Sequence, residues 1–297
     1  MSEPMAVHVP ASRRAEATRA RRRRRVRWLA GWAIFYAILL GGAFALTIPL
    51  AWTVLASFKT RPEIFAVPFR WLPASPQWSN YTEALTAAPF AGYFLNSAFI
   101  AIATTLSNLF FASLAGYGFA RYNFWGRNFF FLAILSTLMV PFQVIMVPLY
   151  ILVRDLGWLN TYQGMIVPGA ITAFGVFLMR QFIQTIPNEL LDAARLDGAS
   201  EFGIYWRIVL PLARPALSAL AIFTFLESWN ALLWPLIVIT DSDLRPLQLG
   251  LAEFTTQNAT DYPLLLAASV TALLPIVILF LVLRREFVRG IVTTGLK

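Results

Sequence analysis

Long uncharged stretches alternate along the chain with short clusters of charge. Five stretches lack Asp, Glu, Lys and Arg, and a sixth contains only Glu227; they are 28–58, 84–120, 128–153, 156–179, 262–283 and 215–240. About 20 apolar helical residues cross the roughly 30 Å hydrocarbon core of a bilayer, so each stretch is long enough to span it. None alternates apolar and polar residues as membrane strands do. The pattern therefore predicts an all-α membrane protein with six transmembrane helices, at about 29–57, 93–119, 129–152, 161–179, 215–239 and 262–283.

Basic residues are distributed unevenly between the predicted loops. With the N-terminus inside the cell, the inner segments hold 19 of the 24 Lys and Arg; these segments are 1–27, 120–128, 180–214 and 284–297. The outer loops hold the other five. This asymmetry follows the positive-inside rule, so both termini are predicted to be cytoplasmic. Residues 1–27, rich in Arg and Ala, are predicted to form a basic disordered tail, and 284–297 a second cytoplasmic tail. The run Arg21–Arg25 favours contact with anionic membrane lipid over nucleic acid.

The composition agrees with a membrane protein and excludes several other classes. The chain is 58% hydrophobic and 13% charged, whereas soluble domains are about 25% charged. One His and no Cys exclude a disulfide scaffold, a zinc finger, a thiol enzyme and an iron–sulfur protein. No His, Cys and acid cluster has metal-ligand or catalytic spacing, so no metal site and no catalytic residues are predicted. Within the second span, Ala112, Gly116 and Ala120 form a small-residue face that predicts close helix packing.

The inner loop 180–214 is patterned as a helix–turn–helix. Asn188 is predicted to cap a first helix after Pro187, and Gly198 to follow its last turn as a C′ glycine. Ser200 is predicted to cap a second helix that ends before Pro211. Apolar residues at helical spacing, which are Leu190, Leu191 and Ala194, are predicted to form the buried face of the first helix.

This loop carries four acids, Glu189, Asp192, Asp197 and Glu201. A helix that lies on lipid favours basic residues instead, so the acids favour docking to a protein. The small side chains of Ala193 and Ala194 are predicted to leave a flat surface that suits insertion into a partner's groove.

The spacing within the loop resembles the EAA loop of ABC-importer permeases. Asp192-Ala193-Ala194 is followed after three residues by Gly198, after nine more by Ile208, and then by Leu210-Pro211. The single departure is Asp192, where the family usually has Glu. The resemblance implies a type I importer fold in which the 187–211 loop couples to an ATP-binding subunit. The implied ATPase-coupling residues are Glu189, Asp192, Ala193, Ala194, Asp197, Gly198, Ile208, Leu210 and Pro211.

Further segments resemble the permeases of carbohydrate importers of the maltose and glycerol-phosphate type. They include Asn80-Tyr81, Pro141-Phe142-Gln143 and Trp229-Asn230. Two departures are Ala231, where the family often has an acid or amide, and the tail Thr294-Gly295-Leu296-Lys297. The resemblance implies a bacterial or archaeal cytoplasmic-membrane permease for a sugar or polyol. Its implied partners are a second homologous permease, two ATP-binding subunits and an extracytoplasmic solute-binding protein.

The chain does not carry the phosphate-binding loop of an ATPase, which needs Gly-x4-Gly-Lys-Ser/Thr. Lys59 is preceded by no such glycines, and Lys297 is the last residue. We therefore expect a pore subunit that is not an enzyme and binds no cofactor itself, with ATP and Mg²⁺ on the partner ATPase.

Glu227 lies in the middle of the fifth predicted span, where a charge costs about 2.5–3.5 kcal/mol on the insertion scale. At helical spacing, Glu227 shares one face of the span with Thr224, Asn230 and Trp234. An acid, an amide and an indole suit sugar recognition, so these residues are predicted to line the path of a sugar, with Trp229 and Gln143 nearby. Alternatively, Glu227 braces the helices, or the two tryptophans only pack. A non-sugar solute and a proton-coupled carrier that uses Glu227 also remain open.

Overall fold

A computed structural model describes residues 11–86, 89–253 and 261–294 of the 297-residue chain. Every regular element in these ranges is a helix. In chain order they are α1 (Ala11–Ala56), α2 (Arg61–Ile64), α3 (Ser79–Thr86), α4 (Phe90–Arg121), α5 (Arg127–Thr137), α6 (Phe142–Asp155), α7 (Tyr162–Ile166), η1 (Val167–Gly169), α8 (Ala173–Gln184), α9 (Asn188–Leu196), α10 (Glu201–Ile204), η2 (Tyr205–Val209), α11 (Leu210–Leu212), α12 (Arg214–Trp229), α13 (Leu233–Val238), η3 (Ser242–Leu244), α14 (Leu247–Glu253) and α15 (Tyr262–Thr294).

Three helices in the described part of the chain are long and apolar enough to cross a membrane without a break. They are Trp28–Ala56 of α1, Phe90–Arg121 (α4) and Tyr262–Arg284 of α15. Three further pairs reach that length only together and bend where they join. The bend is 101° between α5 and α6, 40° between α7–η1 and α8, and 78° between the run α10–α11 and α12. The protein thus has three candidate spans, or up to six if each bent pair crosses once.

The prediction of continuous helices is wrong in three places, namely 129–152, 161–179 and 215–239. Pro141 precedes α6, and its ring removes a backbone donor and disfavours helical geometry at the preceding residue. Thr172 restarts the chain as α8, because its side chain accepts a hydrogen bond from the backbone N–H of Gly175. The fifth predicted span ends as a helix at Trp229 and resumes at Leu233.

Both ends of the described chain are more helical than predicted. Since α1 begins at Ala11, the disordered tail predicted for 1–27 is wrong for 11–27, where Ala and Arg are strong helix formers. Residues 1–10 lie outside the described ranges. Helix α15 continues past residue 283 to Thr294, and 295–297 are again outside the described residues.

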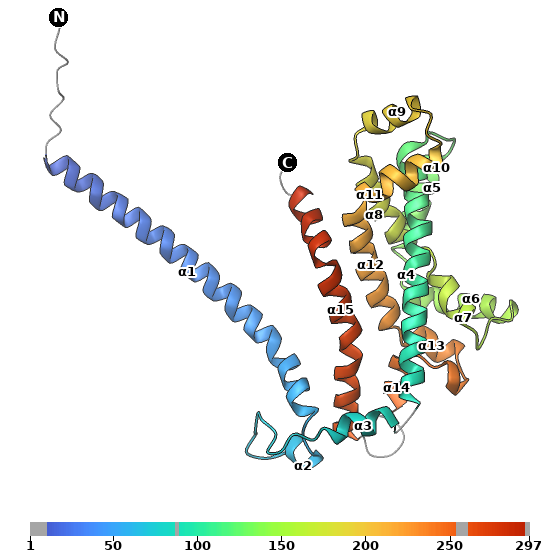
Figure 1. The fold of residues 1–297 in the computed structure, drawn as a ribbon, viewed down its shortest axis with the longest axis horizontal. Helices are drawn as coiled ribbons and strands as arrows, with labels where there is room; N and C mark the ends of the chain where they lie inside the picture. Colours follow the sequence, from blue (N-terminus) through green and yellow to red (C-terminus); the bar gives the residue numbers. More distant parts are fainter. Residues whose placement is uncertain (1–10, 87–88, 254–260, 295–297) are drawn as a thin grey trace, which may run out of the picture.

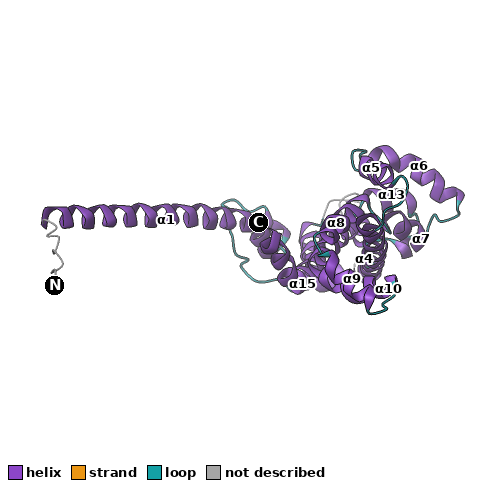
Figure 2. Cartoon of the chain, turned by 90° about the horizontal axis from the view of Figure 1, so that it is seen from above, coloured by secondary structure: helices purple, strands orange, loops and turns teal. Residues whose placement is uncertain are grey.

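Helix α4 is the centre of the bundle. It packs against α8 and α12, and α12 in turn packs against α15 (Figures 1 and 2). The predicted small-residue seam is confirmed: Ala112 is fully buried, and a Cβ on Gly116 would lie 2.7 Å from the Cβ of Met179. Helix α1 extends away from this bundle and contacts α15 (Figures 1 and 2). The first turns of α1 and the last turns of α15 lie at the same end of the molecule as α9 and α10 (Figure 1).

Candidate functional site

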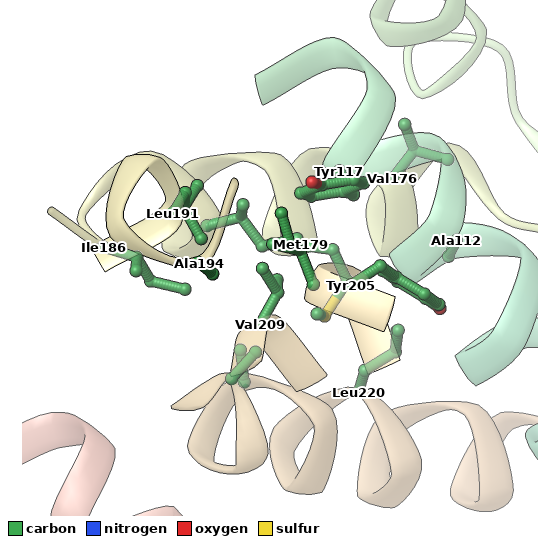
Figure 3. Close-up of a cluster of buried hydrophobic side chains, with 14 residues drawn as sticks. Ala112, Tyr117, Val176, Met179, Ile186, Leu191, Ala194, Tyr205, Val209 and Leu220 are labelled. Carbon is green, nitrogen blue, oxygen red and sulfur yellow. The ribbon is translucent and has the colours of Figure 1, made fainter. Parts of the chain in front are cut away.

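The segment predicted to dock on a partner has α9 as its outermost helix (Figure 1). One face of α9 is anchored: Leu191 and Ala194 are buried in a cluster that includes Met179 of α8 and Ile186 (Figure 3). Leu190 was predicted to share this face, but it is 48% exposed, because it lies one residue off the Leu191 and Ala194 stripe. The helix therefore rests on the bundle through a narrow apolar stripe.

The opposite face of α9 is open to solvent. Glu189, Asp192, Ala193 and Asp197 are all exposed there, and Leu196 is 90% exposed. Of the predicted flat surface, Ala193 and the acidic residues lie on the outside, together with the exposed Leu190 and Leu196. The prediction is wrong for Ala194, which is buried because it lies on the same helical stripe as Leu191. A patch of this kind is typical of a protein-binding surface rather than of a buried helix.

The turn after α9 has the geometry predicted for it. Gly198 has a φ of 80°, which favours glycine. Its N–H bonds to the carbonyl of Arg195, and the N–H of Ala199 bonds to the carbonyl of Ala194, both at 3.0 Å. These two bonds make a Schellman motif, which satisfies carbonyls that the helix end leaves free. A side chain at 198 would meet no atom within 4 Å, so the backbone angle is what requires glycine.

The second helix of the loop starts as predicted and ends later. The Ser200 hydroxyl accepts a hydrogen bond of 3.2 Å from a backbone N–H of the first turn. The helix does not stop before Pro211, because a π-helical turn carries the chain from α10 into α11, where proline is tolerated in the first turn. Ile208 and Leu210 are half-buried against the cluster below α9, whereas Pro211 is exposed. Two of the motif residues thus support the loop rather than face a partner.

Arg121, the last residue of α4, clamps α9 to the bundle. Its guanidinium donates to the backbone carbonyl of Ile183 in the last turn of α8, to that of Ile186 just after α8, and to Oδ1 of Asn188. Asn188 was predicted to cap α9, but Pro187 occupies the cap position and the Asn188 side chain serves the arginine instead. One side chain therefore joins the ends of three helices at the base of the docking surface.

Glu201 is the centre of a second polar link beneath α9. Its carboxylate accepts from Nε of Arg195 at 2.7 Å, from the Tyr122 hydroxyl at 2.8 Å and from the Tyr117 hydroxyl at 3.0 Å. Arg195 also donates to Asp192 at 2.7 Å. The hydrogen bond from Arg195, followed by that from Tyr122, lowers the pKa of Glu201 to about 2. The network joins α9, α10 and α4 through charged groups that stay ionised near neutral pH.

A cavity of about 540 Å³ lies where the broken helices meet α4. Four residues predicted to form a solute path line it together: Thr224, Glu227, Asn230 and Trp234. The breaks before α8 and after α12 both reach the cavity wall, and irregular backbone at membrane depth is tolerated only where protein or a cavity surrounds it.

These four residues differ in how accessible they are. Thr224 is buried, and Nε1 of the buried Trp234 donates to the carbonyl of Gly164 at 2.9 Å. Glu227 and Asn230, by contrast, are exposed to solvent. The carboxylate and the amide are therefore the most accessible polar groups among these four residues.

The other two predicted path residues lie elsewhere. Trp229 is 1% exposed, donates from Nε1 to the carbonyl of Ala272 on α15 at 3.1 Å, and stacks on Phe225. It is a packing residue, because one position on a helix turns the side chain by about 100° from the cavity stripe. Gln143 is exposed on α6 and is not among the residues that line the cavity.

Sequence reasoning missed Asn108, which is fully buried in the middle of α4. Its Nδ2 donates to Thr224 Oγ1 at 2.8 Å and to Thr172 Oγ1 at 3.1 Å, and its Oδ1 accepts from the Thr172 backbone N–H at 2.9 Å. The network ties α4 to α8 and α12 at the cavity wall. An amide in the middle of a predicted span was the available signal, because such a group needs a partner when it is buried. Thr104, one turn away, lines the cavity with a buried hydroxyl that has no hydrogen-bond partner in the described part of the chain.

Residues 108–291 match the family model of the binding-protein-dependent transport system inner membrane component. This chain belongs to that permease family. It is 41% identical over 258 residues to the arabinooligosaccharides transport system permease protein of Halalkalibacterium halodurans, covering 86% of this chain and 92% of the relative. It is 33% identical over 265 residues to the sn-glycerol-3-phosphate transport system permease protein of Yersinia enterocolitica, covering 86% and 94%.

The fold of the permease agrees with this membership. It is similar, with a TM-score of 0.76 and 25% identity, to a crystal structure of a bacterial ABC transporter involved in the import of the acidic polysaccharide alginate. The similarity covers 86% of this chain and 96% of that one. The predicted resemblance to carbohydrate and glycerol-phosphate importer permeases is confirmed. The protein is thus a multi-pass inner-membrane permease of a binding-protein-dependent importer, and its role is transport rather than catalysis.

Proposed function

We propose that this permease forms half of the pore of an ATP-driven importer for a sugar or oligosaccharide. The observation that carries the proposal is the cavity at the broken helices, where Glu227, Asn230 and Trp234 converge. A carboxylate and an amide bond hydroxyl groups, and an indole packs on a sugar ring. The arabinooligosaccharide relative and the alginate importer, by their names, act on the same class of solute.

In this proposal six spans form a type I importer fold. They are the three unbroken helices, the α5–α6 and α7–α8 pairs, and α12 with α13, while α10 and α11 stay in the cytoplasmic coupling loop. Both termini are cytoplasmic. This orientation is supported by the fact that α9, the start of α1 and the end of α15 all lie at the same end of the molecule (Figure 1). The excess of basic residues in the inner segments supports it as well.

The exposed face of α9 docks in a cleft of an ATP-binding subunit. Two such subunits serve the two permeases of the complex, and ATP and Mg²⁺ bind there, because this chain lacks the phosphate-binding loop. Closure of the ATPases on ATP moves α9, and the clamp at Arg121 and the Glu201 link pass that movement to α4.

A second homologous permease completes the pore. The spanning part of α1 has none of its apolar window buried within the chain, and Glu227 is exposed on the open side of the cavity. Lipid and the second permease cover these surfaces in the complex. A solute-binding protein delivers the sugar to the outer end, where α3 and α14 lie (Figure 1).

Glu227 distinguishes a neutral sugar from an anionic solute. A carboxylate at the cavity mouth repels a phosphate ester such as that named for the glycerol-phosphate relative. The carboxylate does not repel the uncharged hydroxyl groups of a neutral sugar, so we favour a neutral sugar as the solute.

The test is uptake into proteoliposomes that contain the assembled complex and the binding protein, with arabinooligosaccharides as the solute. We expect uptake that requires ATP and is blocked by vanadate. Glu227→Gln should slow uptake, whereas Asp155→Asn, which changes an exposed acid at the end of α6 away from the cavity, should not. Uptake of sn-glycerol 3-phosphate instead would identify the other solute class. Uptake driven by a proton gradient without ATP would refute the importer proposal.

A further inference from the structure

An exposed apolar surface lies on the loop between α2 and α3, which we term the outer aromatic loop (residues 65–78). Its large apolar side chains point to solvent: Phe65, Val67, Phe69, Trp71, Leu72 and Trp78. Val67 at its tip is 96% exposed. The loop lies beside the outer end of α1, away from α8 and α9 (Figures 1 and 2). Contiguous exposed apolar surface of this kind marks an interaction site.

The loop is held in a defined shape by buried polar contacts. Lys59 is fully buried, donates to the carbonyl of Arg70, and has its Nζ 4.2 Å from the centre of the Trp52 ring. The Glu63 carboxylate accepts from the backbone N–H of Ala74 at 3.0 Å. These contacts fix the shape of the loop, and its apolar side chains stay about half exposed or more even where Phe69 and Trp71 contact Trp52.

The loop lies at the depth of the outer lipid headgroups. Trp28 and Trp52 are 24 residues apart on α1, which is about 36 Å along a helix, slightly more than the roughly 30 Å hydrocarbon core. Tryptophans at both ends of a span mark the two interfaces. The Trp52 ring lies 4.6 Å from Phe69 and 6.0 Å from Trp71, so these loop residues share its depth.

The charges of the loop fit a phospholipid surface. Arg61 and Arg70 are exposed beside the aromatic side chains, and they are two of the five basic residues outside the cell. Guanidinium groups bind phosphate, and Trp and Phe bury their rings at the level of the headgroups. We propose that the outer aromatic loop is an interfacial anchor that inserts Val67, Phe69 and Trp71 into the outer leaflet and binds lipid phosphate through Arg61 and Arg70.

The chain has no cysteine, so a single introduced thiol reports on one position of this subunit. The assembled importer, with its other subunits free of reactive cysteine, is reconstituted in phospholipid nanodiscs with Val67→Cys carrying a nitroxide label. Ser242→Cys, at an exposed site on the separate outer element η3, is the matched control. The measurement is the collision rate of each label with oxygen, which partitions into lipid, and with a water-soluble nickel chelate.

We expect the oxygen-to-nickel collision ratio to be several-fold higher at position 67 than at position 242. Equal ratios at the two positions would overturn the proposal. A second outcome would also overturn the proposal: the label at position 67 collides with the nickel chelate but not with oxygen in lipid, and loses these collisions only when the solute-binding protein is added. That result would identify the solute-binding protein as the occupant of this surface. Retention of ATP-dependent uptake in both variants shows that the labelled complexes are folded, and this control is independent of which solute is transported.

Discussion

Arg121→Met tests whether the docking helix moves together with α4. Methionine keeps an unbranched side chain but removes the guanidinium that bonds to the carbonyls of Ile183 and Ile186 and to Asn188. Two of these bonds reach α9 or its connection to α8, namely those to Asn188 and Ile186. At about 1.5 kcal/mol for each bond from a charged donor, their loss costs about 3 kcal/mol. That is roughly a 100-fold change in the equilibrium between attached and detached α9. We expect ATP hydrolysis to continue while solute uptake per ATP falls about tenfold or more, because movement of α9 no longer reaches α4.

The assay measures ATP hydrolysis and solute uptake on the same proteoliposomes. Arg127→Met is the matched control, since Arg127 bonds to Tyr122 and Asn123 within its own loop and not to α8 or α9. It should leave the ratio of uptake to hydrolysis unchanged. If Arg121→Met keeps the wild-type ratio in a complex that retains its ATPase subunits, the clamp does not couple α9 to α4 and the reasoning is wrong.

Three further predictions concern the docking surface and the bundle. Ala193→Trp places a bulky ring on the exposed face of α9, so the ATPase subunits should be lost on co-purification while the permease stays folded. Asn108→Leu removes three hydrogen bonds between helices and should lower the free energy of unfolding in detergent by about 1–3 kcal/mol, measured by thermal denaturation. For Glu201, the folded pKa of about 2 lies below the ordinary 4.5, so its stabilising contribution is present above about pH 4.5 and is lost as the pH falls through 2. Glu201→Gln should therefore change the uptake rate by a constant factor between pH 5 and 8, and a factor that varies across that range would contradict the assigned ionisation.

Proline and glycine positions show how far local sequence rules reach. The rules predicted the turn at Gly198 and the cap at Ser200, because both depend on the backbone within a few residues. They did not predict the complete break with a 101° bend at Pro141, because a kinked helix and two separate helices have the same local sequence. The direction of the second helix is set by what it packs against.

The sequence by itself determined the class and predicted the approximate spans, the orientation and the coupling loop, since hydrophobicity, charge bias and caps act along the chain against water and lipid. The tertiary structure alone decided which residues meet. Asn108 and Thr224 are 116 residues apart, and only the packing of α4 on α12 brings them to hydrogen-bond distance. Likewise, Trp229 and Trp234 look alike in sequence, yet one is buried against α15 and the other reaches the cavity. The break after α12 separates their directions, and that break is stabilised by contacts distant in the chain.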